Sequence, residues 1–248
     1  MNPLDATSRA ARMLPGDSEV CETCGSRVTG LCRPLSEAAL DEVMGEAEQI
    51  ALGPRAMLFQ EGEKAAHVFT LVQGTAKLTR LLPDGREQVL GFRFVGDIIG
   101  YTTGETYPFA VQLLTGAKLC RIERPKLEEL MRRLPALERR LLDLCIQELS
   151  ATQDQLVSVG RRPAEARLAA FLLQLGESGK RRLQVGTQLD MPMTRADIAD
   201  FLGLTLETVS RSFTAFRRRG WVREPAHNVV EILKPQALHE LVDGVAFE

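Results

Sequence analysis

Two short helix signatures joined by a glycine constrain this chain more than any other feature. They occupy residues 194–223, where Thr194 begins a capping pattern with Asp197 three residues later. Gly203 permits a tight turn, and Thr205 can cap the second helix. Four apolar residues are expected to form a buried stripe along that second helix: Leu206, Val209, Phe213 and Phe216. The pattern predicts a helix-turn-helix, which places its second helix in the major groove of DNA.

The opposite face of the second helix is polar and fits base recognition. Arg211 can donate two hydrogen bonds to guanine, Glu207 can accept from the cytosine amino group, and Ser210 can bond either way. Glu207 and Arg211 are also four residues apart, so an ordinary surface ion pair is the alternative interpretation. Contacts to DNA phosphates are expected from five further residues: Thr194, Thr205, Arg217, Arg218 and Arg219.

The charge distribution is compatible with double-stranded DNA as the partner. The net charge is −2, but from Arg161 onward 13 Lys and Arg stand against 11 Asp and Glu. Binding must therefore come from a local basic patch. Two short apolar runs around Pro225–Asn228 are typical of a β-hairpin, which would form a wing beside the second helix.

The preceding part of the chain changes character twice. Between Ile50 and Ile122, short apolar runs alternate with turn residues such as Pro83-Asp84-Gly85, which favours an antiparallel sandwich or barrel. A helical pattern follows, with a stripe at the alternating spacing of a two-helix coiled coil: Leu142, Cys145, Leu149, Thr152, Leu156 and Val159. The stripe predicts a homodimer, made weaker by the polar Thr152, and packing of the helix on its own domain is the alternative.

Four of the five cysteines indicate metal or redox chemistry. Cys21 and Cys24 form a C-x2-C pair, Cys32 follows after seven residues, and Cys120 is distant. The odd number of cysteines argues against a disulfide framework. Four thiolates could hold a [4Fe–4S] cluster or a zinc ion, and plain thiols are the third possibility. Cys145 is interpreted as an apolar member of the helical stripe.

The chain resembles the CRP/FNR superfamily of bacterial regulators. Glu207-Thr208-Val209-Ser210-Arg211 matches the E-x-x-S-R motif of the FNR-like branch, and Pro163–Phe171 is similar to the helix that opens its DNA-binding domain. The resemblance implies an α+β fold with a cyclic-nucleotide-binding-like β-roll and a winged helix-turn-helix. Its expected parts are an N-terminal arm with the cysteine cluster at 1–34, an antiparallel β-roll at 35–124, a dimerisation helix at 125–160 and a DNA-binding domain at 161–248.

The resemblance also implies a function and its residues. FNR-like regulators bind an inverted repeat of TTGAT-like half-sites, in which Arg211 would read guanine, Glu207 the paired cytosine and Ser210 a thymine. Their four cysteine ligands correspond here to Cys21, Cys24, Cys32 and Cys120, although the gap before Cys32 is longer than in the best-known FNR. Oxygen-sensitive control of dimerisation by a [4Fe–4S] cluster is therefore expected. The loop at Asp84, Gly85 and Arg86 would contact RNA polymerase.

Several other functions are not expected from the sequence. No arginine lies between Gly96 and Cys120 to pair with the phosphate of a cyclic nucleotide, so none is expected as a ligand. No nucleophile–base pair indicates an enzyme, and no apolar run reaches the roughly 20 residues of a membrane span. A cytoplasmic location is expected. A cluster-free regulator that senses thiol oxidation and a zinc-stabilised DNA-binding protein are the alternatives.

Overall fold

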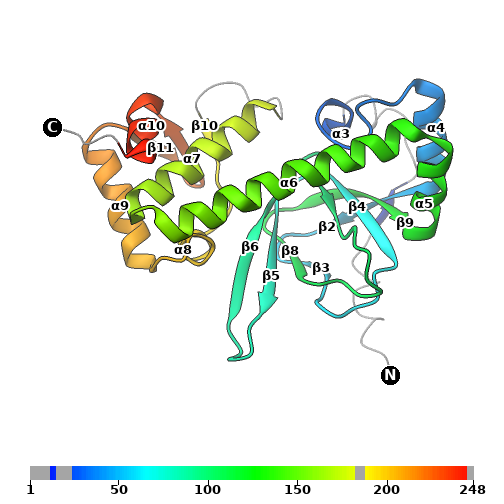
Figure 1. Ribbon diagram of the computed structural model, residues 1–248, viewed down its shortest axis with the longest axis horizontal. Helices are drawn as coiled ribbons and strands as arrows, with labels where there is room; N and C mark the ends of the chain where they lie inside the picture. Colours follow the sequence, from blue (N-terminus) through cyan, green and yellow to red (C-terminus); the bar gives the residue numbers. More distant parts are fainter. Residues whose placement is uncertain (1–11, 15–23, 182–187, 245–248) are drawn as a thin grey trace. The chain divides into compact units, whose positions relative to one another are not determined.

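The computed structural model describes residues 12–14, 24–181 and 188–244 (Figure 1). The chain forms two compact units, Met1–Gln147 and Glu148–Glu248. Within the described residues, no helix combines the length and apolar character that a bilayer crossing requires. The long helix α6 (Pro135–Arg161) is continuous through the boundary between the units.

The first unit contains the predicted antiparallel β-roll, built from two sheets. One sheet has the order β1 (Arg12–Leu14), β2 (Ala47–Leu52), β9 (Ala117–Glu123), β4 (His67–Gln73) and β7 (Ile98–Ile99). The other has the order β3 (Met57–Phe59), β8 (Ala110–Leu113), β5 (Ala76–Leu81) and β6 (Glu87–Arg93). All paired strands are antiparallel, which confirms the fold class expected from the alternation of apolar runs and turns.

The inside of the roll is filled by its own aromatic and aliphatic side chains. The rings of Phe59 and Tyr107 stack with centroids 3.7 Å apart, and Phe69 lies next to Phe59. Gly100 has a positive φ of 83°, and a Cβ there would lie 3.0 Å from the Tyr107 ring. A side chain at this position would therefore strain the backbone and press on the aromatic core.

Among its described residues, the first unit contains all or part of four helices. They are α3 (Gly25–Val28), α4 (Glu37–Glu46), α5 (Arg124–Arg133) and the start of α6. The segment 125–160, expected as one helix, is divided at Leu134, because Pro135 has no amide proton to continue α5. A second core joins these helices to the roll through buried residues including Leu31, Val43 and Leu137.

The second unit is the predicted winged helix-turn-helix. Its elements are α7 (Ala164–Arg181), β10 (Gln188–Asp190), α8 (Arg195–Leu202), α9 (Leu206–Arg218), β11 (Val222–Ala226), β12 (Val229–Ile232) and α10 (Pro235–Asp243). The hairpin β11–β12 turns at Asn228, which has a positive φ of 60°, and β10 adds a third strand to the wing. The expectation that Leu206 is buried is wrong: it is the first residue of α9 and lies at the exposed end of the apolar stripe.

Candidate functional site

The helix-turn-helix is fixed by local capping bonds that the sequence pattern anticipates. Thr194 Oγ1 accepts a hydrogen bond from Asp197 N (3.0 Å), and Asp197 Oδ2 accepts one from Thr194 N (2.9 Å), which completes a capping box. Gly203 adopts the left-handed conformation, with φ 62° and ψ 42°. Thr205 then caps α9 by accepting from Thr208 N at 3.2 Å. The capping box fixes the start of α8, Gly203 ends that helix, and Thr205 fixes the start of α9.

The predicted reading face of α9 is open to solvent. Glu207, Ser210 and Arg211 are all exposed. No ion pair joins Glu207 to Arg211 among the described residues, and Arg211 Nη2 instead donates to Thr208 Oγ1 at 3.4 Å. A hydrogen bond from its own amide and one from the Thr205 side chain lower the pKa of Glu207. The carboxylate and the guanidinium are thus both charged and accessible to a base edge.

The buried face of α9 carries a contact that the sequence analysis missed. The Arg195 guanidinium lies over the Phe213 ring, 3.2 Å from its centroid, and pairs with Glu224 of the wing. Burial lowers the pKa of Arg195 to about 10. Glu224 also pairs with Arg217 at 3.0 Å. Arg195 and Glu224 are far apart in the sequence and form no local motif, yet they hold α8, α9 and the wing together.

The five residues expected to contact phosphates differ in their exposure and in their partners within the protein. Arg217 pairs with Glu224, whereas Arg219 pairs with Glu165 of α7 at 2.7 Å and lies over the Trp221 ring. Arg218 is exposed and makes no ion pair within the described part of the chain. The hydroxyls of Thr194 and Thr205 are used in capping. Arg218 is therefore the arginine of this group most available to DNA.

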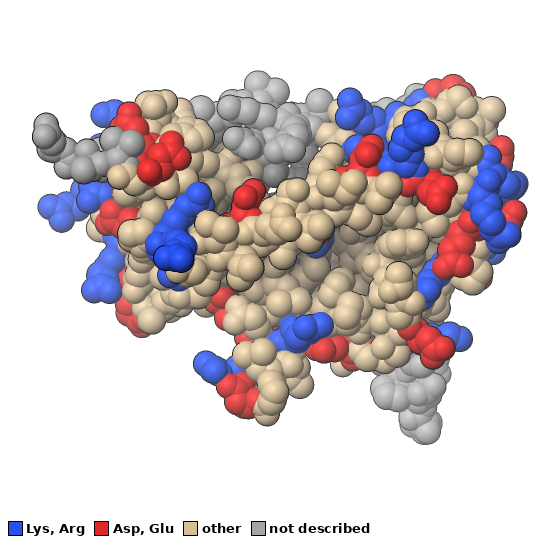
Figure 2. All heavy atoms as spheres, viewed as in Figure 1, with Lys and Arg blue, Asp and Glu red and all other residues tan. Residues whose placement is uncertain are grey.

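Helix α6 carries an exposed apolar stripe. Five large apolar side chains are between 53% and 75% exposed: Leu142, Ile146, Leu149, Leu156 and Val157. Cys145 and Thr152 are exposed as well. In Figure 2, the side of α6 turned to the viewer is largely uncharged. Ile146 and Val157 were not in the predicted stripe, although Ile146 lies one turn after Leu142 and Val157 lies about three turns after Ile146 on the same side of the helix.

The end of α6 is tied to the turn of the helix-turn-helix. Gln155 Nε2 donates to Phe201 O at 3.0 Å. Arg167 of α7 donates to Leu202 O (3.2 Å) and Gly203 O (3.3 Å). Val159, predicted in the dimer stripe, is half-buried, and a Cβ on Gly203 would lie 3.4 Å from its Cγ1. Within the second unit, α6 and α8 are thus held in a defined relation.

Three of the four predicted ligand cysteines line one cavity in the first unit. Cys24 and Cys32 flank the short helix α3 and the turn that follows it, and Cys120 projects from β9. Cys24 is buried, and the other two are half-buried. Cys21 lies outside the described residues. The structure therefore brings together residues separated by 88 positions in the sequence, as a shared ligand site requires.

One buried polar atom without a partner lies in the lining of this cavity, and a second lies on a strand that borders it. Ser26 is 2% exposed and lines the cavity, and its Oγ has no hydrogen-bond partner. Gln49 is opposite Cys120 on the neighbouring strand, is 5% exposed, and its Nε2 has no partner. Such atoms are costly unless something bonds to them. The thiols and these polar atoms fit a sulfur-rich group in chemical type, although no three His, Cys, Asp or Glu side chains of the described ranges are placed to hold a metal ion.

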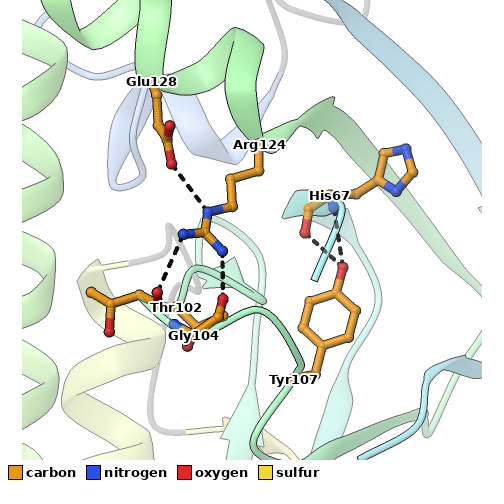
Figure 3. A network of polar contacts seen from close by, with 7 residues as sticks. His67, Thr102, Gly104, Tyr107, Arg124 and Glu128 are labelled. Carbon is orange, nitrogen blue, oxygen red and sulfur yellow. Dashed lines mark hydrogen bonds and ion pairs between the residues drawn. The ribbon is translucent and has the colours of Figure 1, made fainter. Parts of the chain in front are cut away.

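Polar contacts also hold the loop that follows β7, as Figure 3 shows. Arg124, at the start of α5, donates to Gly104 O (2.5 Å) and pairs with Glu128 (3.1 Å). Tyr107 Oη donates to His67 O at 2.7 Å. Burial raises the pKa of Tyr107, and burial lowers that of His67. Arg124 is thus committed to protein carbonyls and a carboxylate.

The predicted polymerase loop is the tip of the β5–β6 hairpin (Figure 1). Arg86 pairs with Asp84 at 2.7 Å, and both side chains are exposed. Gly85 has a positive φ of 83°, and its amide donates to Leu82 O at 2.9 Å. The hydrogen bond from Arg86 lowers the pKa of Asp84, so this tip presents a closed pair of opposite charges.

Comparison with known proteins assigns both units. Residues 49–134 match the family model described as a cyclic nucleotide-binding domain, and residues 166–241 match that of a Crp-like helix-turn-helix domain. The transcriptional activatory protein AadR of Rhodopseudomonas palustris is 40% identical over 80% of this chain and 83% of its own length. The nitrogen fixation regulation protein FixK of Bradyrhizobium diazoefficiens is 31% identical over 92% and 96%. The structure of FixK2 from Bradyrhizobium japonicum has a TM-score of 0.72, with 31% identity over 79% of this chain and 96% of that one.

Proposed function

Because the chain belongs to the CRP/FNR family of DNA-binding transcription regulators, we propose that it binds an inverted repeat of TTGAT-like half-sites as a homodimer. We propose further that a [4Fe–4S] cluster controls the dimer in response to oxygen. The observation that carries the second proposal is the cavity shared by Cys24, Cys32 and Cys120. Three thiols from two distant segments and the partnerless Ser26 Oγ line this cavity, which supports a thiolate-ligated group there.

The DNA is read by the exposed face of α9. Arg211 donates to guanine O6 and N7, Glu207 accepts from the paired cytosine, and Ser210 contacts the neighbouring thymine. The absence of an ion pair between Glu207 and Arg211 in the described structure supports this assignment, because the two charges are not paired with each other. Arg218 contacts a phosphate and supplies salt-dependent affinity, with Arg217 and Arg219 beside it.

Cys21, Cys24, Cys32 and Cys120 would hold the cluster, which would supply oxygen-sensitive iron–sulfur chemistry when bound. The segment from Cys24 to Cys32 is ordered against the roll while these thiols are engaged. Its order favours pairing of the α6 stripes, which sets two copies of α9 about one DNA turn apart, roughly 34 Å. Loss of the thiol ligation releases the segment, the dimer and the DNA.

Two further assignments follow from family membership. The hairpin tip at Asp84, Gly85 and Arg86 contacts RNA polymerase, and the regulator acts in the cytoplasm. The relatives named as an activatory protein and a nitrogen fixation regulation protein support a role in activating promoters.

The cluster proposal is tested by purifying the protein without oxygen. We expect a brown protein that absorbs at about 400 nm, contains iron and sulfide, and is bleached by air. Cys120→Ser should lose this absorbance. Cys145→Ser is the matched control and should keep it, because Cys145 is exposed on α6.

A second candidate is a cluster-free regulator that senses thiol oxidation. It needs only the thiols of Cys24, Cys32 and Cys120, which line the cavity. A colourless anaerobic protein whose DNA affinity changes with reversible thiol oxidation would support this candidate. A colourless protein that contains zinc and binds DNA equally in air would point to the zinc-stabilised alternative.

A further inference from the structure

Arg140 of α6 bonds directly to the cysteine-bearing segment. Its Nε donates to Gly30 O at 3.0 Å, and its Nη2 donates to Thr29 O. These carbonyls follow the four-residue helix α3 and immediately precede Leu31 and Cys32. One side chain of the dimerisation helix therefore holds the backbone between two of the proposed ligands.

The environment of Arg140 gives this contact its specificity. The side chain is half-buried, and burial lowers its pKa, with Arg33 acting in the same direction. No carboxylate pairs with it within the residues that the structure describes. The two carbonyl bonds, together with the nearby charge of Asp143, offset the loss of hydration of the guanidinium, and this pair of bonds suits the forked geometry of arginine.

The cysteine segment is also held from its other sides. A Cβ on Gly30 would lie 2.6 Å from Gly96 O and 2.5 Å from Ser26 Oγ, so the backbone is in close contact with the roll. Leu31 is buried in the same core as Leu137 of α6. A segment gripped by the roll on one side and by α6 on the other cannot shift without disturbing one of them.

We propose that Arg140 is the positioning residue through which the cysteine segment sets the alignment of the first turns of α6. Arg140 stands two residues before Leu142, the first member of the exposed stripe. When the segment is ordered, its carbonyls hold Arg140 and present the stripe for pairing. When the segment is released, the guanidinium loses both acceptors, and the start of α6 loses its fixed position. This inference rests on the proposed cluster-controlled dimer.

The test uses the full-length protein with Arg140→Gln, and with Arg139→Gln as the control, since Arg139 is exposed on the same helix. Two quantities are measured before and after exposure to air: the absorbance at about 400 nm and the dimer dissociation constant. We expect the dimer dissociation constants of wild type and Arg139→Gln to rise at least about tenfold on bleaching. Arg140→Gln should bind the cluster, but its dimer dissociation constant should change by no more than about twofold on bleaching.

The outcomes separate this inference from the proposal on which it rests. An equal response of Arg140→Gln and wild type would overturn the role of Arg140. A wild-type dimer that does not respond to bleaching would overturn the proposed function instead. If Arg140→Gln does not take up a cluster, hydrogen exchange on wild type decides: protection of residues 29–33 and 137–144 should be lost together on bleaching. Loss in one range alone would contradict the coupling.

Discussion

The hydrogen bond of Thr152 alters the effect that this residue is expected to have on the stability of the dimer. The sequence presents it as a polar defect in an apolar stripe. Its Oγ1 donates to Glu148 O at 2.8 Å, within the same helix. A hydroxyl that is already bonded costs less to bury than an unbonded one. Thr152 therefore weakens a dimer seam less than its polarity alone suggests.

At the reading face, Arg211→Ala should lower affinity for the specific DNA site by about 1–3 kcal/mol and relax the preference for guanine. Arg211 is exposed, so its loss should leave folding intact. Arg218→Ala is the control: it should weaken binding to all sequences equally and reduce the salt dependence. Fluorescence anisotropy with specific and scrambled duplexes measures both. An equal loss on both duplexes for Arg211→Ala would make it a phosphate contact.

Beside the cysteine cavity, Gln49→Leu tests whether Nε2 is without a partner in the cluster-free protein. Removing an unbonded buried amide should leave the free energy of unfolding unchanged or raise it by about 1 kcal/mol. In the anaerobic protein, the same substitution should speed bleaching by air, because a donor beside Cys120 is gone. Urea denaturation and the decay of absorbance measure these effects. A destabilisation of the cluster-free protein by more than about 2 kcal/mol would contradict the assignment.

At the scale of elements, the exposed stripe of α6 makes a direct prediction for Leu149→Asp. A charge in the middle of the seam should convert the dimer to a monomer at micromolar concentration and abolish binding to the inverted repeat. Leu149 is 58% exposed, so the thermal stability of the single chain should change little. Gln147→Asp, exposed but off the stripe, is the control for helix propensity. Sedimentation velocity distinguishes the two, and an unchanged dimer in Leu149→Asp would rule out this interface.

Elements with local signals were predictable from the sequence. The capping box at Thr194, the turn at Gly203 and the alternating strands of the roll each depend on a few neighbouring residues. The surroundings of residues at the ends of an apolar stripe were not predictable. Leu206 and Val159 both fit the apolar spacing, yet Leu206 is exposed and Val159 packs near Gly203. The helical spacing of apolar residues does not show how far along the helix the surface that covers them extends.

Contacts between distant residues were the other part that the sequence did not reveal. The grouping of Cys24, Cys32 and Cys120 was expected from family resemblance, because no local pattern relates β9 to the N-terminal cysteines. Gln49 and Arg140 were missed entirely. A buried amide and a helical arginine have no distinctive spacing, and their roles depend on which carbonyls or thiols the fold brings near.

Under the proposed function, α6 is the element of the whole molecule that connects the cysteine segment with DNA reading. Near its start, Arg140 bonds the cysteine segment, and near its end, Gln155 bonds Phe201 O at the close of α8. The stripe that would pair two copies lies between these contacts. The proposed function therefore predicts that a change at the cysteines alters the pairing of the α6 stripes and, through that pairing, DNA binding by α9.

The most direct measurement compares DNA binding by the anaerobic protein before and after exposure to air. Two duplexes are used, one with an inverted repeat of TTGAT-like half-sites and one with a single half-site. The account predicts that the brown protein prefers the inverted repeat at least about tenfold and loses this preference as the absorbance at about 400 nm disappears. A colourless anaerobic protein that binds the inverted repeat with the same affinity in air would contradict it.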